Sequence, residues 1–179
     1  MKILLRMIMA IAALTGMQTI AAQAWAEEKI VLEATATWES KGNIYLTGKD
    51  QAMFVGGLRG VMFVQDGKGT LNAAQIVCPG SIEVNLTSGE SQGEGRCIVT
   101  GASGDRVFAA WECVGIATVG CIGKFDLTAG TGRFQGVTGG GPFVLRSAIG
   151  QLRADMITGE VDSIGLGLAS WPKLTLVLP

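Results

Sequence analysis

The stretch Thr128–Pro142 (TAGTGRFQGVTGGGP) constrains the fold more than any other part of the chain, because six of its residues are glycine. Gly130 and Gly132 can adopt the positive φ values of tight turns, and Arg133–Val137 is too short and too glycine-flanked for a helix, so it predicts a short strand. The later glycines predict bulges, where a strand bends or another backbone comes close. Closing a small barrel requires such features, so this stretch predicts a corner of a β-structure.

The rest of the chain has the pattern of strands joined by turns. Ile30–Trp38 alternates apolar and polar residues, which predicts a strand with one wet face. About ten candidate strands, mostly of about 5 to 8 residues and some of them merging, follow along the chain, and no helix is predicted after residue 26. Glycine makes up 27 of 179 residues, far above the usual ~7%. We therefore predict an all-β fold, a single antiparallel closed β-barrel of about eight strands, formed by residues 27–179.

The start of the chain predicts export. Met1–Ala26 combines the basic residues Lys2 and Arg6, the apolar run Met7–Leu14 and the small-x-small site Ala24–Ala26, which together are typical of a cleaved signal peptide. A membrane anchor is the alternative, but polar residues interrupt the apolar run well before the ~20 residues that a spanning helix needs. The expected location is the periplasm or the medium, with no transmembrane anchor after cleavage.

All four cysteines lie after the predicted cleavage site, and an even number in an exported chain indicates disulfides. Three pairings are open. We favour Cys78 with Cys97 and Cys113 with Cys121, because each pair would link strands that are adjacent in the sequence. A metal site is the alternative, but the sequence has no histidine and no CxxC pair, so we predict neither a metal nor a cofactor.

The charge pattern argues against a nucleic-acid partner. Lys2 and Arg6 are two of the 14 basic residues, so residues 27–179 hold 12 basic against 15 acidic side chains, a net charge of −3. The basic residues are scattered singly and form no stripe, so no nucleic-acid binding is predicted.

The lack of histidine excludes the familiar Ser-His-Asp and Cys-His catalytic sites. Aromatic residues and charged residues embedded in apolar strands are then the candidates for a ligand site, because a buried charge in a dry barrel could anchor or polarise a ligand. The candidate ligand-binding residues are Trp38, Phe108, Trp111, Glu112, Phe134 and Arg146. The alternative is that the aromatic residues are plain core and that the charged ones face solvent or pair with each other.

Two motifs carry a family resemblance. The pattern GTGRFxGxxG begins at Gly130, and a Gly104-Asp105 pair precedes a strand with Trp111-x-Cys113. The first motif resembles a segment of allene oxide cyclase barrels and plant dirigent proteins. The second motif extends the resemblance, more loosely, to secreted bacterial proteins of unassigned function. The resemblance implies a small antiparallel barrel. A nucleotide-binding glycine loop is the rival, but the spacing here is GxGxxxG and no helical pattern follows.

The resemblance to allene oxide cyclases implies an apolar cavity that folds a fatty-acid epoxide into a ring, and the resemblance to dirigent proteins implies steering of radical coupling. No functional residue of either family matches a position here. We expect an exported soluble barrel that binds a small apolar or amphipathic molecule in its interior. The alternatives are a cofactor-independent cyclase or isomerase, which needs an inward acid or base, and a structural or interaction protein with a solid barrel. A membrane barrel is disfavoured because the predicted strands are shorter than the ~9 to 11 residues needed to cross.

Overall fold

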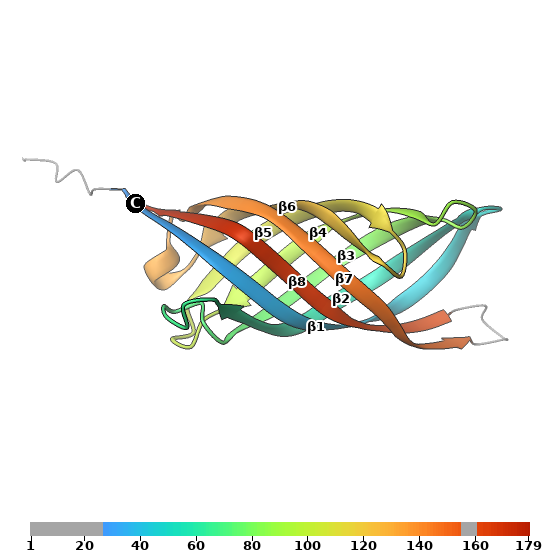
Figure 1. Cartoon of the computed structure of the whole chain (residues 1–179), viewed down its shortest axis with the longest axis horizontal. Helices are drawn as coiled ribbons and strands as arrows, with labels where there is room; N and C mark the ends of the chain where they lie inside the picture. Colours follow the sequence, from blue (N-terminus) through green and yellow to red (C-terminus); the bar gives the residue numbers. More distant parts are fainter. Residues whose placement is uncertain (1–26, 155–160) are drawn as a thin grey trace, which may run out of the picture.

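The protein is a closed barrel of eight antiparallel strands that follow one another around the wall in chain order (Figure 1). The computed structural model describes residues 27–154 and 161–179, so the predicted signal peptide lies outside the described residues. The strands are β1 (Glu28–Gly48), β2 (Gln51–Val64), β3 (Ala74–Asn85), β4 (Glu90–Thr100), β5 (Arg106–Ile116), β6 (Gly120–Gly130), β7 (Thr138–Ala154) and β8 (Val161–Leu178). Strand β8 pairs with β1 and closes the barrel, which confirms the predicted fold class.

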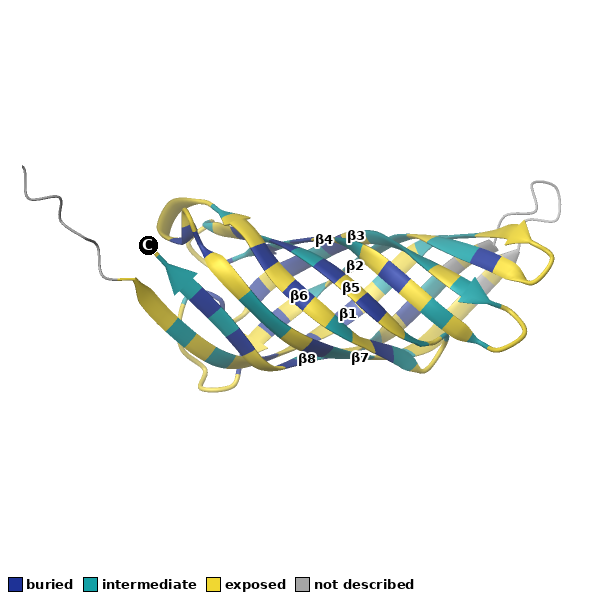
Figure 2. Ribbon diagram, turned by 90° about the horizontal axis from the view of Figure 1, so that it is seen from above, coloured by how far each residue is buried: buried dark blue, intermediate teal, exposed yellow. Residues whose placement is uncertain are grey.

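Alternation along each strand decides which side chains enter the lumen. In β1, Ala34, Ala36 and Trp38 are buried, while Thr35 and Thr37 between them are exposed. Buried residues alternate with exposed or half-buried ones along much of the wall that Figure 2 shows. The apolar row of each strand therefore fills the lumen, and the strand predicted from the pattern of residues 30–38 is confirmed.

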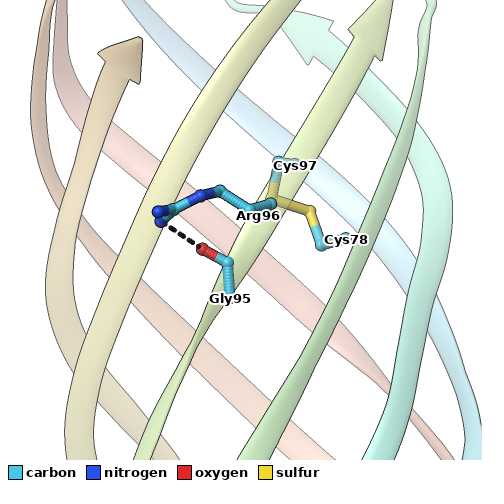
Figure 3. Close-up of a disulfide and its surroundings, with 4 residues drawn as sticks. All are labelled: Cys78, Gly95, Arg96 and Cys97. Atoms are coloured by element: carbon cyan, nitrogen blue, oxygen red, sulfur yellow. Dashed lines mark hydrogen bonds between the residues drawn. A yellow bond between two sulfur atoms is a disulfide. The ribbon is translucent and has the colours of Figure 1, made fainter.

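The strands are longer than predicted. They span 11 to 21 residues, because glycines and prolines that were expected to end strands lie inside continuous ones. Pro79, for example, lies within β3, and the β3–β4 pairing is interrupted there, between Val77↔Ile98 and Gly80↔Gly95. The Cys78–Cys97 disulfide crosses from β3 to β4 at this interruption (Figure 3). Figure 3 also shows the guanidinium of Arg96, which donates to the carbonyl oxygen of Gly95.

Strand length therefore does not distinguish this barrel from a membrane barrel, and that part of the sequence argument is wrong. The outer face carries paired charges. Glu39 pairs across strands with Arg59, and Glu112 with Lys124, all exposed on the wall. Membrane barrels carry an apolar outer band around a polar interior. Here the described lumen is apolar, and the outer wall carries exposed apolar residues such as Phe63 and Leu168 beside the charges.

The glycine-rich stretch closes one end of the barrel. Residues Gly132–Phe134 form a short 3-10 helix (η1), in which Gly132 has φ +57°, so the strand predicted for Arg133–Val137 is wrong. Phe134 and Val137, 4% and 1% exposed, pack into the end of the lumen as a plug. The predicted bulge is confirmed by the register shift between Gly140 and Val144 in the β7–β8 pairing.

Polar contacts hold the loops of the plugged end together. The Arg133 guanidinium lies 3.5 Å from the Asp105 carboxylate and donates to the Thr70 hydroxyl. Asp105 also accepts a hydrogen bond of 2.9 Å from Ser103. Because Thr70, Asp105 and Arg133 belong to three different loops, these contacts join the β2–β3, β4–β5 and β6–β7 connections at one end of the barrel.

Candidate ligand-binding cavity

The lumen is hollow toward the end opposite the plug. A cavity of about 160 Å³ lies there, between residues of all eight strands and of the β5–β6 turn. Its wall is mainly apolar and includes Trp38, Phe54, Leu58, Ile82, Trp111 and Leu145. Most of the polar groups that line it are side-chain hydroxyls, those of Ser40, Ser91, Ser147 and Thr118. The cavity is therefore a mostly apolar chamber with a few neutral polar groups.

Glycines in the wall explain why the lumen is hollow although it holds large rings. A Cβ atom at Gly167 would lie 2.5 Å from Cζ2 of the Trp38 ring, and one at Gly80 would lie 2.5 Å from Cζ2 of the Trp111 ring. A Cβ at Gly56 would meet the Phe54 ring at the same distance. The three rings thus lie directly against backbone that has no side chain, which leaves space along the barrel axis.

Below the cavity the lumen is nearly filled by an aromatic cluster. Phe125 packs edge-on against Phe143 and Trp171, with ring centroids 6.5 Å and 5.3 Å away. A void of about 40 Å³ remains beside this cluster and is lined by Trp38, Trp111 and Trp171. Such a void holds at most about one water molecule, so the cluster forms the floor of the cavity.

The described lumen is a mostly apolar, uncharged site. The Nε1 atoms of Trp38, Trp111 and Trp171 are buried and have no hydrogen-bond partner among the described residues. Every carboxylate of residues 27–154 and 161–179 lies outside the lumen, and none of them lines the cavity. The carboxylates of Asp155 and Glu160 lie outside the described residues. An uncharged ligand suits this wall, because a buried charge without a partner is strongly disfavoured.

The structure separates the six candidate residues named from the sequence. Trp38 and Trp111 line the cavity. Phe134 is buried in the plug at the other end. Phe108 and Glu112 alternate with the buried Val107, Ala109, Trp111 and Cys113 of β5 and so face outward, and Arg146 is exposed on β7. The cavity also contains residues that the sequence did not single out, namely Phe54 and the three serines.

Both disulfides belong to the wall of the lumen. Cys78 pairs with Cys97 across β3 and β4, and Cys113 pairs with Cys121 across β5 and β6, which confirms the favoured pairing. All four cysteines are buried, with 3% to 9% of their surface exposed. Cys78, Cys113 and Cys121 line the cavity, so the covalent links hold its wall.

Comparison of the sequence with protein-family models and with curated proteins finds no match. The resemblance to allene oxide cyclase and dirigent barrels therefore stays a prediction. Within the described ranges, no cluster of three or more cysteine, aspartate or glutamate side chains could hold a metal ion. No helix in the same ranges is long and apolar enough to cross a membrane.

Proposed function

We propose that this protein is an exported soluble barrel that binds a small apolar or amphipathic molecule in its interior. The observation that carries the proposal is the apolar cavity of about 160 Å³ behind the β5–β6 turn. A cavity of about 150 Å³ lined by aliphatic and aromatic side chains is large enough to bind benzene. The expected ligand therefore places a ring or a short hydrocarbon segment in this chamber.

Export is supported by the disulfides. Two disulfides within one small domain are typical of proteins that work in an oxidising compartment, such as the periplasm or the medium. The signal-peptide pattern of the first 26 residues points the same way.

Binding is favoured over the two alternatives. A cyclase or isomerase of the expected kind needs an acid or a base that faces the substrate, and no carboxylate or basic side chain of the described residues lines the cavity. A purely structural barrel would have a solid core, whereas glycines hold the rings of Trp38, Phe54 and Trp111 against the wall and keep the chamber open.

A Ser147→Leu variant is expected to lose the ligand. Ser147 is half-buried in β7 and lines the cavity, so a leucine there would occupy part of the chamber. The protein is purified from its own compartment and measured by native mass spectrometry, which we expect to detect a small-molecule mass that denaturation releases. In Ser147→Leu the fraction of protein that carries this molecule should fall at least about tenfold. A tenfold loss of affinity corresponds to ~1.4 kcal/mol of binding free energy.

The matched control is Ser170→Leu, because Ser170 lies between the buried Ala169 and Trp171 of β8 and so faces outward. This variant should keep the ligand. A protein that is empty in the native spectrum and also fails to take up added small hydrocarbons would contradict the proposal and favour a structural or interaction role.

A further inference from the structure

A shallow groove of about 680 Å³ crosses the outer wall of the barrel beside the β5–β6 turn. Its apolar side chains include Val114 and Ile122, which are 57% and 59% exposed. Its polar side chains are the amides of Gln51, Asn85 and Gln92, the hydroxyl of Ser91, the carboxylates of Glu83 and Glu90, and the guanidinium of Arg146. The Asn85 amide oxygen already accepts hydrogen bonds from the backbone N–H groups of Thr87 and Ser88, and Glu90 accepts one from the Ser88 hydroxyl. The other amides, the Ser91 hydroxyl, the second carboxylate and the guanidinium offer hydrogen-bond donors and acceptors beside an apolar surface, unlike the mostly apolar lumen.

The groove and the cavity meet at the rim of the barrel. Ile116 and Gly120, the residues that flank the β5–β6 turn, line both of them. The turn is held at the rim by two backbone hydrogen bonds, from Ala117 N–H to the carbonyl of Gly89 (2.8 Å) and from Ser147 N–H to the carbonyl of Val119 (3.1 Å). A molecule that leaves the cavity over this turn therefore reaches the groove directly.

We infer that the ligand is amphipathic, with its apolar part in the cavity and a neutral head rich in hydroxyl groups in the groove. The inference rests on the proposed function and specifies the class of ligand. Side-chain amides both donate and accept hydrogen bonds, and carboxylates accept them from hydroxyl groups, so this set matches a sugar-like head. Two carboxylates against one guanidinium give the groove a net charge of −1, which disfavours an anionic head.

The test compares four probes that share a six-carbon chain: hexyl glucoside, hexan-1-ol, hexanoate and hexylammonium. Binding is followed by NMR through the indole N–H signals of Trp38 and Trp111, whose rings line the cavity. All four probes place the same chain in the chamber, so differences in affinity report the head. We expect hexyl glucoside to bind about tenfold more tightly than hexan-1-ol, as one or two net hydrogen bonds would produce, and hexanoate to bind more weakly than the glucoside.

A Gln92→Ala variant localises the effect to the groove. Gln92 is exposed on the outer face of β4, so its loss should remove most of the tenfold advantage of the glucoside and leave the affinity for hexan-1-ol unchanged. Gln75→Ala, an exposed glutamine on the outer face of β3 that does not line the groove, should change neither affinity.

The outcomes separate the two proposals. If hexan-1-ol binds but the glucoside binds no more tightly, the groove does not hold the head, and the interior-binding proposal stands alone. If hexylammonium binds most tightly, the head is cationic and the inference of a neutral head is wrong. If none of the four probes shifts the indole signals, the cavity takes no hydrocarbon chain, and the proposed function fails together with this inference.

Discussion

Replacing Phe125 by alanine is expected to lower the free energy of unfolding by about 3 to 5 kcal/mol, the usual cost of removing a fully buried aromatic side chain. Phe125 is 2% exposed and packs against both Phe143 and Trp171 at the centre of the lumen. Its removal would leave a cavity next to the existing void of about 40 Å³, where neighbouring rings fixed by the barrel wall cannot collapse to fill it.

The measurement is urea unfolding followed by tryptophan fluorescence. The urea concentration at the midpoint should fall, while the dependence of the unfolding free energy on urea (the m-value) stays unchanged. Phe63→Ala is the matched control. Phe63 is 48% exposed on the outer face of β2, so its loss should cost less than about 1 kcal/mol. Equal losses in the two variants would contradict the assignment of Phe125 to the core.

Removing the Cys78–Cys97 disulfide is expected to lower the free energy of unfolding by about 3 kcal/mol, through the added conformational freedom of the unfolded chain. The two cysteines are 19 residues apart, and Cys113 and Cys121 are 8 apart, so loss of the second link should cost slightly less. Alanine pairs (C78A/C97A and C113A/C121A) are the appropriate variants, because all four positions are buried and serine would add an unpaired hydroxyl.

These effects are measured by denaturant unfolding of the two variants and of the wild type. The wild type is unfolded both with and without a reducing agent. The reduced wild type should approach the variant that lacks both links. A stability that does not change when either link is removed would show that the barrel wall needs no covalent support at these positions.

The sequence predicted the all-β class and the closed barrel, and among three open cysteine pairings it favoured the one that the structure has, because strand alternation and the spacing of neighbouring strands are visible in the local pattern. Ile30–Trp38 shows its alternation directly, and each disulfide joins neighbouring strands. Strand length was not predictable in the same way. A glycine or proline ends a strand in isolation, but in the closed wall a neighbouring strand can still hold the backbone in place, as β2 does by pairing Gly57 with Pro79.

The ligand cavity was only partly predictable. Trp38 and Trp111 belong to rows that alternate visibly, so their inward direction follows from the sequence. Phe54 and Ser147 lie in strands whose glycines hide the alternation of apolar and polar residues, so their direction cannot be read from the sequence. Trp171 lies beside a register shift in the β1–β8 pairing, which interrupts the alternation there. The Trp38 ring packs against Gly167 of β8, and the Trp111 ring packs against Gly80 of β3. Because each glycine lies on a different strand from its tryptophan, these contacts follow from the register of the barrel and not from the local sequence.

The start of β1 and the end of β8 lie together at one end of the barrel, and their position matters for experiments that attach this protein to a surface or to a label. Glu28 pairs with Leu178 where β1 and β8 meet, at the end of the barrel that carries the plug (Figure 1). A Cβ at Gly136, in the loop of the plug, would lie 2.9 Å from Pro179. Immobilisation or fusion through the C-terminus therefore leaves the cavity and the outer groove facing away from the support, open to any molecule in solution.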